Sequence, residues 1–226
     1  MGDSYFFCFL QRGVHRMLVI HEIFRTIQGE GYDTGLPCTF IRLYGCNLKC
    51  VYCDQPQSLE DTRKMSIEEI IEEVEKLQVK NICITGGEPL KQGNVYPLID
   101  QLVMLGYNVS VETNGSVPLR VGENRKYKFV MDIKCPSSQV ENSNRFDNLA
   151  KLTENDEVKF VIADKSDYYY MRTVLEVNPT KAKVLLSPMF DFNQKQTIGK
   201  DLCEWVLEDN LDVRIQIQMH KVLGVL

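Results

Sequence analysis

The 226-residue sequence lacks any apolar run long enough to cross a bilayer and lacks a convincing signal peptide. It also lacks a run of basic residues, and its formal net charge is −5. A membrane span and direct contact with nucleic acid are therefore not expected, because surfaces that bind nucleic acid concentrate positive charge. The length supports one α/β domain with a substantial core but is short for a complete (β/α)₈ barrel.

Cysteine is not scarce, since the chain has eight. Without a secretory signal this indicates a reducing cytoplasm, where clustered cysteines are usually metal-binding or catalytic. Cys46, Cys50 and Cys53 stand four and three residues apart, so one short loop can turn three thiolates toward an iron–sulfur cluster or zinc. No cysteine or histidine follows until Cys83, so one coordination position is expected to stay open for a small molecule. A zinc site completed by Cys38, or three thiols without a metal, remain alternatives.

From Leu18 onward, strand-like segments alternate with helix-like ones. Ser66 and Glu69 form a capping box that predicts an amphipathic helix to about Leu77. This alternation indicates βαβ units and a mostly parallel sheet, and about seven strands predict a partial, open (β/α) barrel. Strands are expected at 38–43, 81–85, 108–113, 127–133, 157–163, 183–187 and 213–218, and further helices near 96–105, 167–177 and 197–209.

Glycines and polar residues follow most of these strands at their carboxyl ends. In a parallel barrel these ends meet at one rim, which is where such folds place their chemistry. Ordinary turn chemistry explains the glycines well. It explains Glu88, Glu112, Asn114 and Lys134 less well, so we expect the site at this rim.

Two motifs resemble those of the radical S-adenosylmethionine (SAM) superfamily. The cysteine loop reads CxxxCxΦC, with aromatic Tyr52 before the last cysteine, and Gly86-Gly87-Glu88 follows a predicted strand. The resemblance implies a [4Fe–4S] cluster held by Cys46, Cys50 and Cys53, with SAM at the open iron. The residues expected to bind SAM are Tyr52, Cys53, Asp54, Gly87, Glu88, Asn114, Lys134, Cys135, Pro136 and Ser137.

Three further segments resemble the 7-carboxy-7-deazaguanine synthase family: HEIFRTIQGEG at 21–31, FIRLYGC at 40–46 and HKVLGVL at 220–226. The resemblance covers residues 17–226, expected to be a single radical SAM domain. Residues 1–16 are expected to be a disordered extension or to reflect an upstream start codon.

That resemblance implies a radical SAM lyase on the route to queuosine or archaeosine in tRNA. Such an enzyme converts 6-carboxy-5,6,7,8-tetrahydropterin to 7-carboxy-7-deazaguanine with loss of ammonia. SAM is cleaved to a 5′-deoxyadenosyl radical and then regenerated. The implied partners are a flavodoxin or ferredoxin as electron donor and a second copy of the chain in a homodimer.

The substrate site is expected to use charged groups of both signs. The planar fork of Arg42 suits the substrate carboxylate, although a strand arginine on the surface is the alternative. Glu30 and the terminal carboxylate of Leu226 are expected to accept the parallel donors of the pterin edge. His220 is also expected to bind substrate, and the alternative is a histidine that only packs near the C-terminus. The other residues expected to bind substrate are Ile27, Gln28, Gly29 and Thr85.

The sequence departs from the family at one metal position. Members typically hold Mg²⁺ through a threonine or serine hydroxyl two residues after the third cysteine, and here that residue is Gln55. A glutamine carbonyl oxygen is an acceptable hard ligand, but its longer side chain would move or replace the ion. Two other functions remain open: another radical SAM enzyme such as a glycyl-radical activase, or a non-catalytic iron–sulfur or zinc-binding module.

Overall fold

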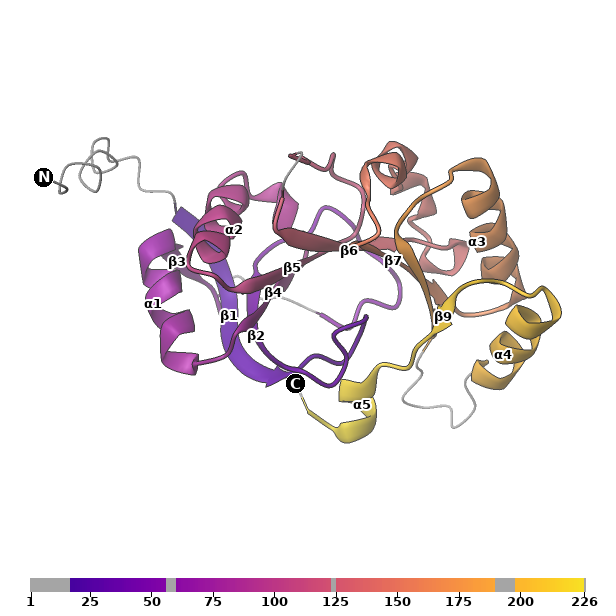
Figure 1. The fold of residues 1–226 in the computed structure, drawn as a ribbon, viewed down its shortest axis with the longest axis horizontal. Helices are drawn as coiled ribbons and strands as arrows, with labels where there is room; N and C mark the ends of the chain where they lie inside the picture. The colour runs from indigo at the N-terminus through magenta and orange to yellow at the C-terminus, as the bar shows by residue number, and fades with distance from the viewer. Residues whose placement is uncertain (1–16, 56–59, 123–124, 190–197, 226) are drawn as a thin grey trace, which may run out of the picture.

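The computed structural model describes residues 17–55, 60–122, 125–189 and 198–225. Its centre is one curved sheet with the strand order β3-β1-β2-β4-β5-β6-β7-β8-β9 (Figure 1). In the described part of the chain, β3 and β9 are its two edges and do not pair with each other. The sheet is therefore an open barrel, as the sequence predicts. No helix within these ranges is long and apolar enough to cross a membrane.

The described elements have the following bounds. The strands are β1 (Met17–Ile27), β2 (Pro37–Leu43), β3 (Arg63–Ser66), β4 (Asn81–Gly86), β5 (Asn108–Thr113), β6 (Tyr127–Ile133), β7 (Glu157–Ile162), β8 (Lys183–Pro188) and β9 (Arg214–Ile215). The helices are α1 (Ile67–Leu77), α2 (Val95–Met104), α3 (Lys165–Val177), α4 (Gly199–Glu208) and α5 (Met219–Leu223). Short 3₁₀ helices cover Pro89–Lys91, Pro136–Ser138, Glu141–Ser143 and Phe146–Lys151.

The sequence prediction and the structure differ at both edges of the sheet. Strands β2 and β4 to β9 run parallel, as expected, but β1 and β3 were not among the predicted strands and pair antiparallel. The short polar segment of β3 has no strand pattern of its own and is extended because it pairs with β1. The expected strand at 213–218 shrinks to Arg214–Ile215, because the chain turns into α5 after Gln218.

Helix α1 forms as its sequence predicts. The Ser66 hydroxyl accepts from the Glu69 N–H at 3.2 Å, and the Glu69 carboxylate accepts from the Ser66 N–H at 2.7 Å. This reciprocal pair satisfies backbone donors that a helix start leaves without partners. Ile70 and Val74, one turn apart, are buried against the sheet.

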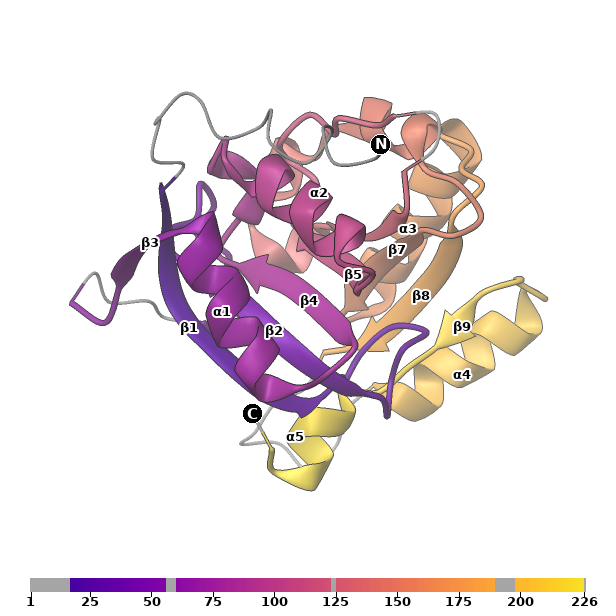
Figure 2. The same cartoon turned by 60° about the vertical axis from the view of Figure 1, so that its left-hand side comes forward.

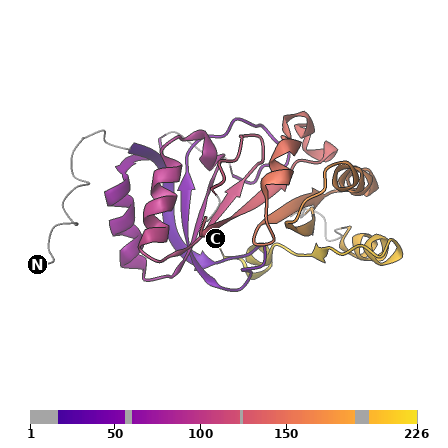
Figure 3. The same ribbon diagram turned by 45° about the horizontal axis from the view of Figure 1, so that its top comes forward.

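The two faces of the sheet differ in chemistry. In β7, Val158, Phe160 and Ile162 are fully buried in the main apolar core, whereas Lys159 and Val161 line a cavity on the other face. Successive side chains of a strand point to opposite faces, so the sheet has an apolar convex face and a more polar concave face. Figures 2 and 3 show the longer helices outside the curve, over the convex face.

Residues 28–36, here called the β1–β2 loop, lie on the concave side. The Tyr32 N–H donates to the Glu157 carboxylate of β7 at 3.0 Å. The Gly31 N–H donates to the side-chain oxygen of Gln216 at 2.6 Å. The loop is thereby attached to β7 and to the residue after β9, both more than a hundred residues later in the chain.

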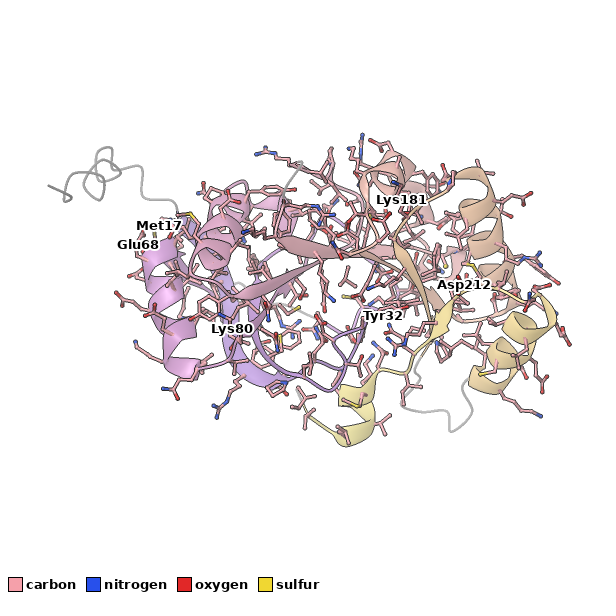
Figure 4. The ribbon with its side chains drawn as sticks, viewed as in Figure 1. Met17, Tyr32, Glu68, Lys80, Lys181 and Asp212 are labelled. Carbon is pink, nitrogen blue, oxygen red and sulfur yellow. The ribbon has the colours of Figure 1, made fainter. Side chains whose placement is uncertain are left out.

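The same loop contacts β8, β9 and the C-terminal segment, which is defined here as residues 216–225. The Tyr32 ring, labelled in Figure 4, contacts two cations: Lys183 Nζ is 4.5 Å and the Arg214 guanidinium carbon 4.3 Å from its centre. The Met219 N–H at the start of α5 donates to the Gly29 carbonyl at 3.0 Å. The C-terminal segment therefore borders the concave side of the sheet.

Candidate functional site

A cavity of about 610 Å³ occupies the concave side. It reaches the carboxyl ends of β4 and β5 and extends to the cysteine loop after β2 and to the C-terminal segment. The residues predicted for the site that line it are Ile27, Gln28, Gly29, Glu30, Arg42, Cys46, Cys50, Tyr52, Cys53, Asp54, Gln55, Thr85, Gly87, Asn114, Lys134 and His220. Leu226 lies outside the described residues, as do residues 1–16.

The three clustered cysteines line one region of this cavity. The Leu48 N–H and the Asn114 side-chain amide point at Cys46 Sγ, at 3.4 and 3.6 Å. The Val51 N–H bonds the Ser138 carbonyl at 3.2 Å and so holds the loop against the end of β6. Donors directed at sulfur stabilise a thiolate, which is the form that binds a metal centre.

The donor set suits an iron–sulfur cluster better than a single zinc ion. Among the described residues, no three cysteine, histidine or carboxylate side chains converge as the ligands of one ion do. Thiolates of a [4Fe–4S] cluster each bind a different iron and lie further apart. Cys38, the residue considered for completing a zinc site, is near the start of β2, at the opposite end from the cysteine loop, and it is buried with Phe40 and Cys83. Burial raises the pKa of the Cys38 thiol to about 12.

The Gly-Gly-Glu turn packs directly on the start of the cysteine loop. A Cβ atom on Gly87 would lie 2.4 Å from the Gly45 carbonyl oxygen, so only glycine fits this approach. The Glu88 N–H donates to the same carbonyl at 2.9 Å. The turn after β4 therefore places its backbone next to the cysteine loop.

The Glu88 carboxylate, predicted to bind SAM, is hydrogen-bonded within the protein itself. It is fully buried and accepts from the Leu90 N–H at 2.9 Å, the Asn114 N–H at 2.7 Å and the Thr113 hydroxyl at 2.9 Å. Burial raises its pKa, although these donors oppose the shift. Its side chain joins the ends of β4 and β5 behind the cavity wall.

The turn after β6 also differs from its prediction. Of its four predicted residues, Lys134 lines the cavity and Cys135, Pro136 and Ser137 do not. Cys135 packs into the apolar core, and the Ser137 N–H donates to Asp167 of α3 at 3.0 Å. The 3₁₀ helix that begins at the proline turns the chain away from the cavity.

Glu30 is the most strongly held carboxylate of the cavity. One oxygen accepts from Lys159 Nζ at 2.6 Å, and the other accepts from the Gln218 amide at 2.5 Å. Burial alone would raise the pKa of Glu30, but the Lys159 ammonium and the Gln218 donor lower it to about 2. Glu30 is therefore ionised at neutral pH although it is buried.

Sequence reasoning missed Lys159 and Asp132. Asp132 accepts from Lys134 Nζ at 3.0 Å and lies 3.6 Å from Lys159 Nζ. Each of these residues is a charge whose two neighbours in its strand are buried core residues. A charged residue between two apolar residues of a predicted strand was the signal that could have identified them. Charges are rarely buried without a partner, so such a residue indicates a polar site on that face of the sheet.

Two further groups point into the cavity from the neighbouring strands. Glu112 of β5 accepts from the Thr85 hydroxyl at 2.9 Å and the Gln28 amide at 3.4 Å. Arg42 is not a surface arginine: its side chain is 12% exposed and its Nε donates to Glu22 at 2.6 Å. The two terminal guanidinium nitrogens of Arg42 carry further donors beyond this bond.

His220 combines the two interpretations considered from sequence. A Cβ atom on Gly29 would lie 2.1 Å from His220 Nδ1, so the ring packs flush on the glycine backbone. It also lines the cavity, and burial lowers its pKa. A packed ring and a binding role are compatible at this position.

Comparison with known proteins gives a consistent result. Residues 40–134 match the model of the radical SAM superfamily. The chain is 42% identical to the 7-carboxy-7-deazaguanine synthase of Koribacter versatilis (strain Ellin345), over 90% of this chain and 96% of the relative. It is 40% identical to the protein of that name from Methanospirillum hungatei JF-1, over 91% of this chain and 85% of the relative.

Two solved structures share the fold. QueE from Escherichia coli superposes with a TM-score of 0.73 at 23% identity, covering 91% of this chain and 96% of that one. Streptococcus suis SuiB bound to S-adenosylmethionine has a TM-score of 0.53 at 12% identity, covering 77% of this chain and 46% of that one.

Proposed function

This chain belongs to the 7-carboxy-7-deazaguanine synthase family, within the radical SAM superfamily, and we propose that it converts 6-carboxy-5,6,7,8-tetrahydropterin to 7-carboxy-7-deazaguanine with loss of ammonia. The reaction would serve queuosine or archaeosine synthesis in the cytoplasm. The observation that carries this proposal is that the three cysteines, Glu30 and Arg42 line one cavity.

Cys46, Cys50 and Cys53 are the residues that would hold a [4Fe–4S] cluster. With SAM bound and one electron delivered by an external reductant, that cluster would supply a 5′-deoxyadenosyl radical able to remove a hydrogen atom from the substrate. We assign the SAM-binding wall to the backbone of residues 52–54, the Gly87 backbone, Asn114 and Lys134. Cys135, Pro136, Ser137 and Glu88 support this wall from behind.

The remaining residues of the chain bind and orient the substrate. Arg42 pairs with the substrate carboxylate through its terminal nitrogens, because a guanidinium matches a carboxylate bidentately. Ionised Glu30 accepts the pterin's adjacent N–H donors on its remaining lone pairs, since each carboxylate oxygen accepts more than one bond. Orientation in a site that excludes water is the main contribution a protein makes to such chemistry. The same pocket includes Ile27, Gln28, Gly29, Thr85, His220 and the terminal carboxylate of Leu226.

Other parts of the proposal concern partners and the metal ion. Gln55, which lines the cavity, offers a side-chain oxygen for Mg²⁺ near the substrate. A flavodoxin or ferredoxin would deliver the electron, and two copies of the chain would form a dimer. Residues 17–226 would act as one catalytic domain.

Anaerobic turnover tests this function. The protein is reconstituted with iron and sulfide, then given SAM, dithionite, Mg²⁺ and 6-carboxytetrahydropterin, and the products are followed by mass spectrometry. We expect 7-carboxy-7-deazaguanine without stoichiometric loss of SAM, and a lower rate when Mg²⁺ is omitted. Cleavage of SAM without a deazapurine would reject the substrate assignment. A protein that binds zinc and leaves SAM intact would reject the radical chemistry too.

A further inference from the structure

The C-terminal segment contacts both the cysteine loop and the pterin pocket. Lys221 Nζ lies 2.8 Å from Asp54 Oδ2, directly after Cys53, and donates to Gln218 Oε1 at 2.8 Å. Gln218 in turn donates from Nε2 to Glu30 at 2.5 Å. These contacts form one continuous series of polar side chains along the cavity wall.

Lys221 sets the direction in which the Gln218 amide faces. An ammonium group only donates hydrogen bonds, so the Gln218 oxygen must face Lys221. The amide nitrogen then faces Glu30, which as an ionised carboxylate only accepts. Lys159 holds the other oxygen of Glu30 from β7. Two donors from opposite walls thus hold the Glu30 carboxylate in one orientation.

This chain of contacts is sheltered. The Lys221 side chain is 11% exposed, against 45% for Asp54. Exposed ion pairs are screened by water and often contribute little. A lysine that is mostly withdrawn from solvent and contacts two partners has fewer alternative positions than an exposed one.

We propose that Lys221 is a positioning residue for pterin recognition, acting through Gln218 on Glu30, and that its bond to Asp54 links this action to the cysteine loop. The inference rests on the proposed function, in which Glu30 accepts the donor edge of the pterin. Without Lys221, the Gln218 amide can rotate and present its oxygen to the carboxylate. Glu30 then loses one of its two donors and the orientation they impose.

The first test is Lys221→Met in the reconstituted enzyme. We expect the KM for the pterin to rise about tenfold while kcat changes less than about threefold, because the lost hydrogen bond to a charged group serves binding. The Kd of 6-carboxypterin, a stable oxidised analogue, measured by anaerobic calorimetry, should rise by the same factor. Lys221→Arg should recover most of the affinity, because arginine also only donates.

A double variant tests the route of the effect. If Lys221 acts through Gln218, adding Lys221→Met to Gln218→Leu should not raise the KM for the pterin or the Kd of 6-carboxypterin any further. Additive losses would overturn this inference. The matched control is Lys181→Met: Lys181 lies 3.9 Å from Glu154 in an exposed pair, and its removal should leave KM and Kd unchanged.

The remaining outcomes separate the two proposals. A wild-type enzyme that makes the deazapurine, with Lys221→Met at the wild-type KM, overturns the positioning role and leaves the proposed function standing. A wild-type enzyme that cleaves SAM and makes no deazapurine overturns both.

Discussion

The two faces of the sheet are formed by the same strands but have different roles. On the convex face, alternate residues of β7 such as Phe160 join an apolar core under the helices. On the concave face, the residue between Val158 and Phe160 is Lys159, which holds Glu30 at 2.6 Å. The convex face stabilises the fold by removing apolar surface from water, whereas the concave face keeps charges buried in fixed pairs that a ligand can use. Substitutions on the convex face should therefore lower mainly the stability of the fold, whereas those on the concave face should also affect ligand binding and turnover.

The largest loss of stability is expected on the convex face. Phe160 is fully buried, so Phe160→Ala should lower the free energy of unfolding by about 3–5 kcal/mol. Urea titration measures the loss, and turnover per folded molecule should change little. The adjacent Val161 lines the cavity and is the matched control, with an expected cost of about 1 kcal/mol for Val161→Ala. Equal costs at the two positions would contradict the division between the faces.

On the concave face, Lys159→Met should cost about 3 kcal/mol at pH 7, since it leaves the Glu30 charge buried without its cation. In the wild type the pKa of Glu30 is lowered to about 2, so its contribution is complete above the usual value of 4.5 and is lost as the pH falls from 4.5 toward 2. In the variant, burial acts unopposed by the ammonium and raises that pKa. As the pH falls, protonation of Glu30 removes the unpaired charge, so the stability deficit of the variant becomes smaller.

Urea titration across pH 7 to 4 checks this expectation. The stability deficit of Lys159→Met should be largest near pH 7 and shrink toward pH 4. Adding Glu30→Gln should restore most of the stability without restoring turnover, because the neutral amide no longer matches the pterin donors. A deficit that stays constant with pH would show that Lys159 acts by packing rather than by charge.

The smallest effect is expected outside both faces, at the start of α1. Ser66→Ala removes the side-chain acceptor of the capping box and should cost about 1 kcal/mol with kcat and KM unchanged. Ser66→Asp keeps an acceptor at the same place and should cost less. A change in KM would mean that this helix start is coupled to the cavity, which the separation of the two faces does not predict.

The comparison also explains what the sequence could reveal. Apolar patterning predicted the parallel strands, and the capping box predicted helix α1, because burial under the helices constrains every second residue of a strand; β1 and β3 were not predicted. Motif spacing predicted the rim, and most of the predicted residues line the cavity. The ion pairs of the concave face were not predictable, since Lys159 and Glu30 are separated by 129 positions in the chain. The contacts of Glu88 with Thr113 and Asn114 were not predictable for the same reason, because these residues lie at the end of another strand, 25 and 26 positions later in the chain.

The bond from Gln218 to Glu30 joins residues 188 positions apart, and that from Gly31 to Gln216 joins residues 185 apart. Contacts this distant in sequence close late in folding, because the loop between them must already be ordered. Strands β1 to β8 all precede the C-terminal segment in the chain, so their sheet can assemble before residues 216–225 dock on it. The proposed pterin pocket is then completed only when this segment docks, so the scaffold can form before the binding site does.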